Sequence, residues 1–566
     1  MTVHPESLLD ALDDGQREAA EALHGPVCIL AGAGTGKTRA ITHRIAYGVA
    51  TGAYDPARVM ALTFTTKAAG EMRSRLAALG AGAVQTRTFH SAALSQLSYF
   101  WPRTLGTRTP ELVRAKVPLV ADAAAQLGER LDTATLRDLA GEIEWRKSRS
   151  MTMEQYAANF EERALVARLG IDRVVDLHGA YERIKDDRRQ MDFEDVLLAT
   201  AGMIAREPDV AQWVREQYRH FTVDEYQDAS PAQTNLLELW LGRRADVCVV
   251  GDPHQTIYSF AGADRASLSR FQSDHPGTRI VQLVRNYRSQ ARVIEIANAL
   301  VHDPERAPLE ATHGAGESVR IEEAETDAAE GARIAERIRE LLASGVEPAD
   351  IAVLVRFHAQ GAPIVQAVRA EGIGIVTEGS SAFFELQVVR KLILAFRAAP
   401  VDDRPLFQQV VDLARDAGWS STPPAGRGEE REQWDAVQAI VNMAEEAGGG
   451  TTLSAFAASL TQMAEAEQQP RVDAVTLATL HAAKGLEWEH VIIAGLSEGI
   501  LPISYATTEA AIEEEGRLFY VGVTRARTSL AFTRSVSSGG APRKASRFLV
   551  PLQDALKRAP SRAARR

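Results

Sequence analysis

The stretch Cys28-Ile-Leu-Ala-Gly-Ala-Gly-Thr-Gly-Lys-Thr-Arg-Ala-Ile-Thr42 decides how the rest of this sequence is interpreted. The apolar run from Val27 to Leu30 predicts a buried strand, and the residues from Thr38 onward predict the helix that follows it. The loop between them is built from glycine, alanine and one threonine before the lysine. Such small residues let backbone N–H groups surround a polyphosphate at a helix N-terminus.

Two side chains at the end of this loop have the chemistry that a bound nucleotide requires. We expect Lys37 to reach the outer phosphates and the hydroxyl of Thr38 to ligate Mg²⁺, as in a P-loop. Ala31 stands where the strict pattern has glycine, a change of one methyl group. From this stretch alone, a glycine-rich turn that carries Gly-Lys-Thr by chance remains the alternative.

The composition is that of a globular protein with several domains. The chain has 566 residues, of which 45% are hydrophobic and 25% are charged, and its length predicts about three to four domains. No apolar run reaches the length of a membrane span and the N-terminus is polar and acidic, so we expect a cytoplasmic protein with no membrane partner. Cys28 and Cys248 lie in apolar runs and do not have metal-ligand spacing, and two cysteines are too few for a disulfide framework. The net charge of −11 argues against general attraction to nucleic acid but permits a local basic groove.

Apolar runs alternate with helical patterns in two long parts of the chain. This alternation predicts an α/β fold with parallel sheets, whose ligand crevice lies at the carboxyl ends of the strands. In the first part we expect strands at Val27–Leu30, at Val59–Lys67 and at Val247–Val250. We also expect a short strand that ends at Thr86–Ser91 and an apolar strand from His220 that ends in Asp224-Glu225. A second α/β unit starts near residue 280, with strands at Ile351–Val355 and Val491–Ala494 and a helix at 328–343. The sheet pattern returns over Val475–Trp488.

Two of the first-part strands end in residues suited to nucleotide hydrolysis. Asp224, after the strand that begins at His220, is expected to hold Mg²⁺ through water, and Glu225 is expected to polarise the attacking water. Adjacent carboxylates often mark only the start of a loop, but a phosphate loop earlier in the chain favours the hydrolase interpretation. Gln255 follows the next strand and is placed to sense the γ-phosphate.

Aromatic residues near the strand ends indicate where a nucleic-acid strand could be held. Phe64 or Phe89 could stack on bases, and Tyr258 and Phe260 could sandwich one, while neighbouring hydroxyls meet phosphates. Packing into the core is the alternative for each of these rings.

Helical patterns without strands interrupt the sheet pattern twice, at residues 92–190 and 386–470. In the first interruption, Trp145, Arg146, Lys147 and Arg149 form a basic-aromatic cluster that is equally compatible with a contact to a nucleic-acid backbone and with a solvated helix face. The second contains polar or glycine-rich loops at 420–428 and 448–450. We also expect an amphipathic helix over residues 7–23 that carries Gln16.

The second α/β unit supplies further nucleotide candidates. Tyr287 could stack on adenine, and Arg288 is a candidate arginine finger. Residues 513–527 predict a helix with Arg525 near its end.

Taken in order, these segments resemble the UvrD/PcrA/Rep group of superfamily 1A DNA helicases. One such motif is weak evidence for the family, but this many motifs in the same sequence order are strong evidence. The resemblance covers the chain from near its start to about residue 530 and rests on these segments: Gln16, Ala31–Thr38, Thr63–Met72, Thr88–Ser91, Asp192–Asp195, Val223–Asp228, Val250–Ala263, Asn286–Ser289, Thr479–Glu487 and Tyr520–Ala526.

The resemblance implies two RecA-like P-loop lobes, each a parallel sheet flanked by helices, with two helical insertions. ATP would lie between the lobes and single-stranded DNA across them, and the family moves 3′ to 5′. The implied domains are residues 1–91 and 191–280 for lobe 1A, 92–190 for insertion 1B, 281–385 and 471–550 for lobe 2A, 386–470 for a short insertion 2B, and 551–566 for a basic tail.

The resemblance also implies a role for each matched residue. The expected catalytic residues are Lys37, Glu225, Gln255, Arg288 and Arg525, and the expected Mg²⁺ ligands are Thr38 and Asp224. The expected ATP site comprises Gln16, Ala31, Gly32, Ala33, Gly34, Thr35, Gly36, Lys37, Thr38, Arg39, Tyr287, Arg288, Glu487 and Arg525, with Gln16, Arg39 and Tyr287 at the adenine and Glu487 at the ribose. The expected DNA residues are Thr63, Phe64, Thr88, His90, Tyr258, Phe260 and His481.

The sequence therefore predicts an ATP- and Mg²⁺-dependent helicase that acts on single-stranded and 3′-tailed duplex DNA, in repair or recombination, with repair or replication proteins as partners. Phe260-Ala261 replaces Trp-Arg of the family, and the second insertion is short, so translocation is a safer expectation than strong strand separation. A small-molecule P-loop kinase or GTPase and an ATP-switched accessory protein are the alternatives. No residue pattern resembles a nuclease metal site.

Overall fold

The computed structural model describes residues 4–159, 164–301, 303, 306–316, 319–378, 383–400, 402, 404–422, 429–447, 451–465 and 473–557. The chain divides into two compact units, one comprising residues 1–31 and 36–283 and the other comprising residues 32–35 and 284–566. Among the described residues, no helix has both the length and the apolar character needed to cross a bilayer. The predicted loop segments 423–428 and 448–450 lie outside the described residues.

The first unit is built on a parallel sheet of six strands in the order β3-β2-β6-β7-β1-β8. Alternate residues of each strand enter opposite cores, because successive side chains of a strand point to opposite faces. Cys28 and Val249 lie on one face, and Ile29 and Cys248 on the other. The strands are β1 Val27–Ala31, β2 Val59–Thr63, β3 Gln85–Thr88, β6 His220–Val223, β7 Val247–Gly251 and β8 Arg279–Leu283.

Helices cover both faces of this sheet. On one face they are α1 Asp14–Glu21, α2 Lys37–Ala50 and α3 Thr66–Ala78; on the other they are α4 Phe89–Leu105, α10 Phe193–Arg206, α11 Pro208–Gln217, α12 Pro231–Leu241 and α13 Ser267–Asp274. The predicted helix over residues 7–23 was wrong in extent, because a 3₁₀ turn at Pro5–Leu8 precedes α1 and Asp13 starts the helix as its N-cap. Asp13 and Gln16 form a capping box, which sets the start of the helix at a point that periodicity alone does not show.

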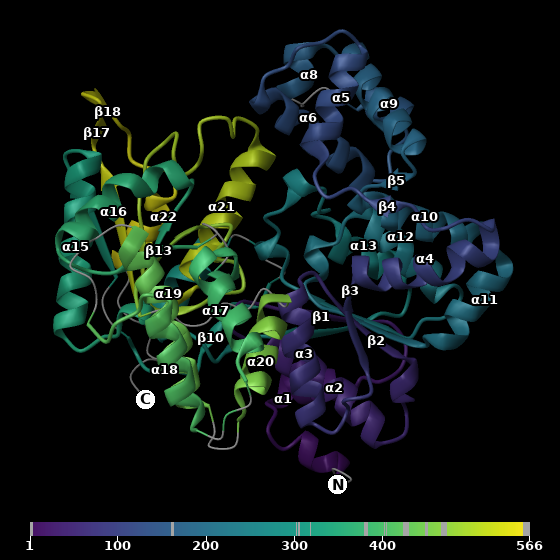
Figure 1. Ribbon diagram of the computed structural model, residues 1–566, viewed down its shortest axis with the longest axis horizontal. Coiled ribbons are helices and arrows are strands. Elements are labelled where there is room, and N and C mark those ends of the chain that lie inside the picture. Colours follow the sequence, from purple (N-terminus) through teal and green to yellow (C-terminus); the bar gives the residue numbers. More distant parts are fainter. Residues whose placement is uncertain are drawn as a thin grey trace. The chain divides into compact units, whose positions relative to one another are not determined.

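Residues between α4 and α10 form the first helical insertion, which has its own core (Figure 1). Its helices are α5 Lys116–Gln126, α6 Thr133–Ser148, α7 Met153–Ala158, α8 Ala164–Leu169 and α9 Ile171–Asp187. A short parallel pair, β4 Glu111–Leu112 and β5 Gln190–Met191, joins the entry and the exit of this insertion, a feature that the sequence pattern did not predict.

The second unit has its own parallel sheet of six strands, in the order β11-β16-β15-β12-β14-β13. The strands are β11 Arg320–Ala324, β12 Ile351–Val355, β13 Ile375–Thr377, β14 Val475–Thr479, β15 Trp488–Ile493 and β16 Ala526–Ser535. Short strands β9 Arg285–Asn286 and β10 Glu310–Ala311 form one pair, and β17 Ser537–Ser538 and β18 Ala541–Pro542 form another. The protein is thus α/β with two parallel sheets flanked by helices, as the sequence predicted.

The helices of the second unit are α14 Ala291–Leu300, α15 Asp327–Ala343, α16 Gly361–Ala370, α21 Glu509–Val523 and α22 Leu549–Lys557 around the sheet. The second insertion adds α17 Gln387–Ala398, α18 Leu406–Asp416, α19 Glu429–Glu446 and α20 Leu453–Glu465 around a separate core. Residues 551–557 of the predicted tail belong to α22, and the rest of that tail lies outside the described residues. Helix α21 ends at Val523, so Arg525 lies beyond the helix that was predicted to contain it.

Candidate functional site

The glycine-rich loop follows β1 and leads directly into α2. Gly34 and Gly36 have φ angles of +70° and +78°, a left-handed conformation that a side chain rarely adopts. Gly36 is the N-cap of α2, and a Cβ there would lie 2.6 Å from Nε2 of Gln16. The loop therefore needs glycine at both positions, and Gln16 packs against it from α1 with only 2% of its surface exposed.

Lys37, the first residue of α2, forms an ion pair with Glu225, with 2.9 Å between Nζ and Oε1. Burial by itself lowers the pKa of Lys37, but the carboxylates of Glu225, Asp252 and Asp224 outweigh it and raise the pKa above its ordinary value. Burial, then Glu225, raises the pKa of Asp224 to about 7. Lys37 and these three carboxylates therefore lie together at the carboxyl ends of β1, β6 and β7.

Gln227 extends this polar chain, although no sequence argument gave it a role. Its amide nitrogen donates to Glu225, and its amide oxygen accepts from the backbone N–H of Asp252 at 3.1 Å. Asp252 in turn accepts from Nε2 of Gln255 at 2.9 Å. Gln227 is fully buried, and Gly251 leaves room for it, since a Cβ there would lie 2.3 Å from its Oε1. Its position two residues after Glu225 was the available sequence signal.

Other predicted nucleotide residues of the first unit have contacts of their own. Ala31 and Thr35 are buried, and Thr35 donates to the Gly32 carbonyl at 2.9 Å. Arg39 is exposed and donates to the carbonyl of Ala11 at 2.7 Å. The Thr38 side chain is half-buried at the first turn of α2. Among the described residues, no group of three or more His, Cys, Asp or Glu side chains could hold a metal ion by itself.

In the second unit, Arg288 and Arg525 meet at the C-terminal end of α21. Arg288 donates to the Thr524 carbonyl at 3.3 Å and forms an ion pair with Glu487. Arg525 is 2% exposed and donates to the carbonyls of Val521 at 2.9 Å and Leu486 at 3.1 Å. Arg525 therefore binds backbone in this structure, and Glu487 pairs with an arginine.

The apex of the glycine-rich loop, residues 32–35, belongs to the second unit together with β9. Nδ2 of Asn286 donates to the Ala33 carbonyl at 2.7 Å, and the backbone N–H of Tyr287 donates to the Gly34 carbonyl at 2.8 Å. Tyr287 as a whole residue is 41% exposed, and a stacking surface requires exposure.

The predicted DNA residues divide into surface and core. Phe260 is 61% exposed, and its ring lies 6.0 Å from that of Tyr258. Phe89, by contrast, is 1% exposed and stacks on Trp240, so the core alternative holds for this residue. Phe64 is half-buried against the same core.

Two predicted threonines have internal hydrogen bonds. Thr63 is 1% exposed and its hydroxyl donates to the Thr65 carbonyl at 3.1 Å, so its side chain does not reach the surface. Thr88 caps α4, with its hydroxyl accepting from the backbone N–H of Ser91 at 3.1 Å. The hydroxyls of both threonines therefore already have hydrogen-bond partners within the protein.

His90 forms a stacked pair with Phe193, a residue that the sequence reasoning did not single out. The ring centroids are 3.8 Å apart and the planes differ by 12°. Phe193 is 54% exposed at the start of α10, directly after the Asp192 N-cap. Burial and the nearby Lys116 lower the pKa of His90 to about 4, so this ring is neutral at pH 7. In the second unit, burial, Arg356 and Lys484 lower the pKa of His481 to about 4 as well.

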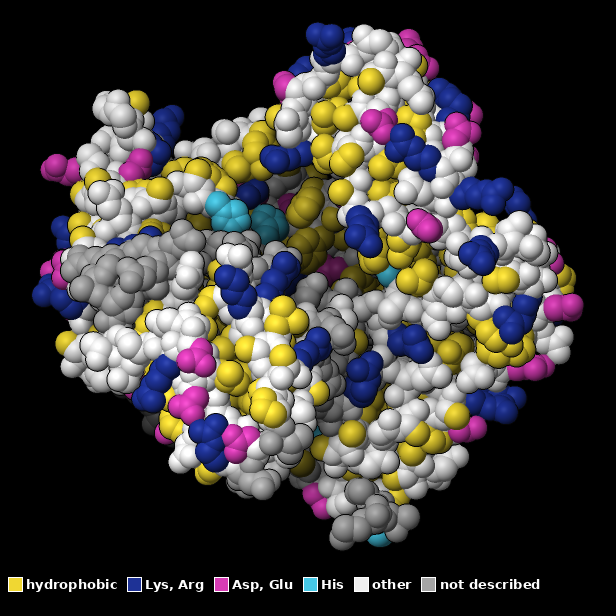
Figure 2. Space-filling model, in the orientation of Figure 1, with side chains coloured by type: hydrophobic (Ala, Val, Ile, Leu, Met, Phe, Trp, Pro, Cys, Tyr) yellow, Lys and Arg dark blue, Asp and Glu magenta, His cyan; other side chains and the backbone are white. Residues whose placement is uncertain are grey.

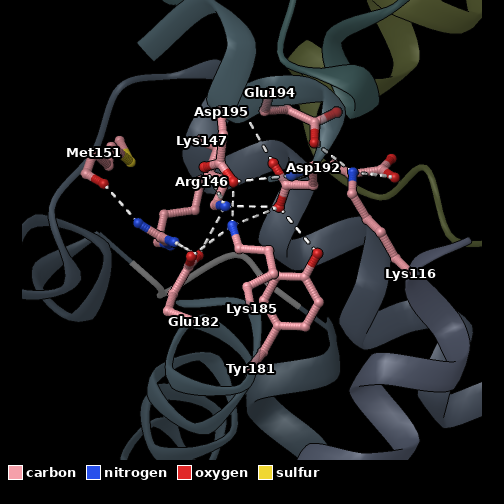
Figure 3. Close-up of polar contacts among 11 residues, drawn as sticks. Lys116, Arg146, Lys147, Met151, Tyr181, Glu182, Lys185, Asp192, Glu194 and Asp195 are labelled. Carbon is pink, nitrogen blue, oxygen red and sulfur yellow. Dashed lines mark hydrogen bonds and ion pairs between the residues drawn. The ribbon is translucent and has the colours of Figure 1, made fainter. Parts of the chain in front are cut away.

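Two members of the basic-aromatic cluster, Arg146 and Lys147 of α6, neither form a solvated helix face nor are exposed for a DNA contact. Both side chains are buried in an ion-pair network with α9 and the start of α10 (Figure 3). Nζ of Lys147 lies 2.6 Å from Asp192, 2.7 Å from Asp195 and 2.9 Å from Glu182. Arg146 pairs with Glu182 at 2.9 Å. Acidic partners more than 30 residues away thus determine the role of these cations.

Lys185 and Tyr181 of α9 complete this network. Lys185 pairs with Asp192 at 3.2 Å and Glu182 at 2.8 Å and also with Asp195, and the Tyr181 hydroxyl donates to Asp192 at 3.0 Å. Burial by itself raises the pKa of Asp192, but Lys147 and Lys185 outweigh it and hold the pKa well below its usual range. The network attaches the first insertion to the helix that carries Phe193.

Two domain families match the chain in succession. The UvrD/REP helicase N-terminal domain matches residues 12–276, and the UvrD-like helicase C-terminal domain matches residues 281–403 and 405–537. ATP-dependent DNA helicase UvrD2 of Mycobacterium tuberculosis is 40% identical over 97% of this chain and 82% of its own length. ATP-dependent DNA helicase PcrA of Bacillus subtilis is 28% identical over 93% of this chain and 83% of its own length. ATP-dependent DNA helicase Rep of Salmonella typhimurium is 29% identical over 92% of this chain and 90% of its own length. The chain belongs to the UvrD/REP helicase family of superfamily 1A.

Proposed function

We propose that this protein is an ATP-dependent DNA helicase that moves 3′ to 5′ along single-stranded DNA and separates duplex DNA. The observation that carries the proposal is the polar chain of the first unit, which runs from Lys37 through Glu225 and Gln227 to Asp252 and Gln255. It connects a phosphate-loop lysine with the ends of two further strands. A change at the phosphates can therefore alter hydrogen bonds along one edge of the sheet.

ATP with Mg²⁺ fits the residues at this edge. Gly34 and Gly36 form a cradle that side chains would fill, and it lies at the N-terminus of α2, where phosphate is favoured. The Thr38 hydroxyl and the Asp224 carboxylate would hold Mg²⁺, which takes few protein ligands beside substrate phosphates. When bound, the metal ion would neutralise charge on the phosphate oxygens.

The chain's own residues would then act as follows. Lys37 would exchange Glu225 for phosphate oxygens, which leaves the carboxylate to accept the proton of the attacking water. Gln227 would keep that carboxylate oriented through its existing hydrogen bond. The proposal places the adenine against Gln16, Arg39 and Tyr287 and the ribose against Glu487. Gln255 would sense the γ-phosphate.

Arg288 and Arg525 are proposed to contact the γ-phosphate from the second unit. A nucleotide that both units bind would favour the approach of the two units to each other. Loss of the γ-phosphate would remove this attraction and let the units separate. Arg288 would exchange Glu487 for the phosphate, whereas Arg525 would have to give up backbone carbonyls. We therefore propose that Arg288 is the more readily recruited finger.

For the DNA, we propose a track that relies on ring stacking. Its residues are Thr63, Phe64, Thr88, His90, Tyr258, Phe260 and His481, with Phe193 added through its stack on His90. On the face shown in Figure 2, Lys and Arg side chains are scattered rather than gathered into one stripe. Base stacking tolerates every sequence, because each base has a π face, and it suits a motor that must pass along any strand.

The remaining assignments are part of the same proposal. Lobe 1A would comprise residues 1–91 and 191–280, insertion 1B residues 92–190, lobe 2A residues 281–385 and 471–550, and insertion 2B residues 386–470. We propose a cytoplasmic role in DNA repair or recombination, with 3′-tailed duplex as a substrate and repair or replication proteins as partners. The names of the UvrD2, PcrA and Rep relatives support the DNA substrate.

The experiment that tests the proposal is an ATPase assay with and without single-stranded DNA, followed by unwinding of 3′-tailed and 5′-tailed duplexes. We expect DNA to stimulate ATP hydrolysis and only the 3′-tailed duplex to be opened. ATPase activity that DNA does not change would refute the motor. Opening of the 5′-tailed duplex alone would refute the direction.

A second candidate is a translocase that unwinds little by itself. The small second insertion favours it, since its described part consists of four helices around one core. A translocation assay that reports movement, beside an unwinding assay that reports none, would select this candidate.

A further inference from the structure

A pocket of about 610 Å³ lies in the first unit at the N-terminal ends of β6 and β7. It belongs to the opposite edge of the sheet from the phosphate loop and Asp224, which follow the carboxyl ends of β1 and β6. A four-residue strand such as β6 separates the two edges by about 13 Å. The pocket is lined by Pro208, Ala211, Gln212, Arg215, Glu216, Arg219, His220, Arg244 and Asp246.

Three arginines give this pocket its electrostatic character. All three line the pocket, and Arg244 donates to the backbone carbonyl of Arg215 at 2.7 Å. Burial lowers the pKa of Arg244, and the like charges of Arg219 and Arg215 lower it further, while the nearby Asp246 carboxylate raises it. Among the residues that the structure describes, none of the three forms an ion pair with a carboxylate. Glu216 is bonded to Gln212, and Asp246 accepts from the backbone of Gly25. With three arginines against two carboxylates, the lining has an excess of positive charge in a chain of net charge −11.

Two of these arginines are held in place before any ligand arrives. Arg215 donates to the Leu239 carbonyl at 3.1 Å, and Arg244 donates to the carbonyls of Arg215 at 2.7 Å and Trp240 at 3.1 Å. Arg219 is exposed, and its side chain has no hydrogen bond to a described residue. Fixed guanidiniums lose little side-chain entropy when they bind an anion, and Arg219 remains available to close over it.

Apart from these three arginines and the carboxylates of Glu216 and Asp246, the lining is uncharged or apolar. Pro208 and Ala211 supply aliphatic surface from α11. Burial lowers the pKa of His220, whose ring lies 4.2 Å from that of Tyr54, so this residue adds no positive charge at neutral pH. A volume of this size is typical of sites for small ligands and short peptide segments.

We propose that this pocket binds a short acidic peptide segment of a partner protein, with its carboxylates on the arginines and an aliphatic side chain on α11. Carboxylates match the planar guanidinium fork, and a polyphosphate would leave the aliphatic wall unused. A pocket of about 610 Å³ has the size of a small-ligand site and is too small to enclose a DNA duplex. Because the motor residues lie at the other edge of the sheet, a docked partner would leave the phosphate loop and the aromatic track accessible.

The test uses the full chain and a fluorescein-labelled hexapeptide, Asp-Glu-Leu-Asp-Glu-Leu, followed by fluorescence anisotropy. A basic counterpart, with lysine at each acidic position, serves as the peptide control. Arg219→Glu and Arg219→Gln probe the pocket, and Arg243→Glu is the matched variant. Arg243 is also exposed and lies beside Arg244 in sequence, but it does not line the pocket. Circular dichroism and DNA-stimulated ATPase activity verify that each variant is folded.

We expect the acidic peptide to bind and Arg219→Glu to weaken it about tenfold, the loss of one charge-assisted hydrogen bond. Arg219→Gln should give a smaller loss, and Arg243→Glu should change affinity less than about twofold. ATPase activity should stay unchanged. The proposal is overturned by equal losses in Arg219→Glu and Arg243→Glu, or by no binding up to about 1 mM peptide. Equal binding of the basic counterpart, or displacement by equimolar pyrophosphate or oligothymidine, overturns it as well.

Discussion

Replacing Lys185 by methionine tests whether the buried network of Figure 3 holds the first insertion on α10. The side chains of Lys185 and Lys147 are 2% exposed, and that of Asp192 is fully buried. Glu182, Asp192 and Asp195 face these two lysines and Arg146. Methionine keeps most of the volume of lysine but leaves three carboxylates facing two cations.

Removing one partner of a buried ion pair costs about 3–5 kcal/mol. Because Lys147 still contacts Asp192 and Asp195 in the variant, we expect the lower end, about 3 kcal/mol. Opening of this region should then become about 10²-fold more frequent, since 1.36 kcal/mol is a factor of ten. Hydrogen exchange with mass spectrometry measures this opening for amides of α6, α9 and α10.

Arg188→Met is the matched control. Arg188 follows α9 and pairs with Asp122 of α5 at 2.8 Å, but both side chains are 49% exposed. Surface pairs contribute at most about 1 kcal/mol, so exchange should accelerate less than about fivefold. Equal exchange in Lys185→Met and Arg188→Met would refute the idea that burial makes the network strong.

The double variant Lys185→Met/Asp192→Asn tests charge balance directly. Asparagine is a good N-cap, so it can keep the hydrogen bond from the Asp195 backbone that starts α10. We expect the double variant to exchange its amide hydrogens more slowly than Lys185→Met alone, because one unpaired charge is gone.

The stability of the network is also pH-dependent. The pKa of Asp192 is depressed in the folded state, so its stabilisation is complete above about pH 4 and is lost as pH falls toward the folded pKa.

Four further predictions concern the proposed motor. Lys37→Ala should abolish ATPase activity, and residual DNA-stimulated hydrolysis would contradict the role of the phosphate loop. Arg288→Ala should leave binding of a fluorescent ATP analogue intact and lower turnover about 10³-fold, and normal turnover would remove the arginine finger. Phe193→Ala should weaken binding of single-stranded DNA by about 1 kcal/mol or more, measured by anisotropy, whereas unchanged affinity would exclude stacking there. Because the pKa values of His90 and His481 are about 4, the salt dependence of DNA binding should be equal at pH 8 and pH 6; a slope steeper by about one at pH 6 would show that a histidine gains charge.

The sequence by itself determined the elements whose signals are local. The strand at Val27–Ala31, its glycine-rich loop and the helix from Lys37 follow from a short apolar run and small residues, and the structure has all three. Cys28 and Cys248 are buried in strands, as their apolar neighbours indicated. Motif order was also sufficient for the family, because matches spread along the chain do not require any knowledge of contacts.

Tertiary structure alone decided what the polar side chains do. Lys147 has the same local pattern as a solvated helix lysine, but its partner Asp192 is 45 residues away. Arg525 lies beyond its helix and binds carbonyls, and Gln227 joins residues at the ends of two strands. A charge or an amide is compatible with water and with a buried partner alike, so its role depends on what the fold brings within hydrogen-bonding distance.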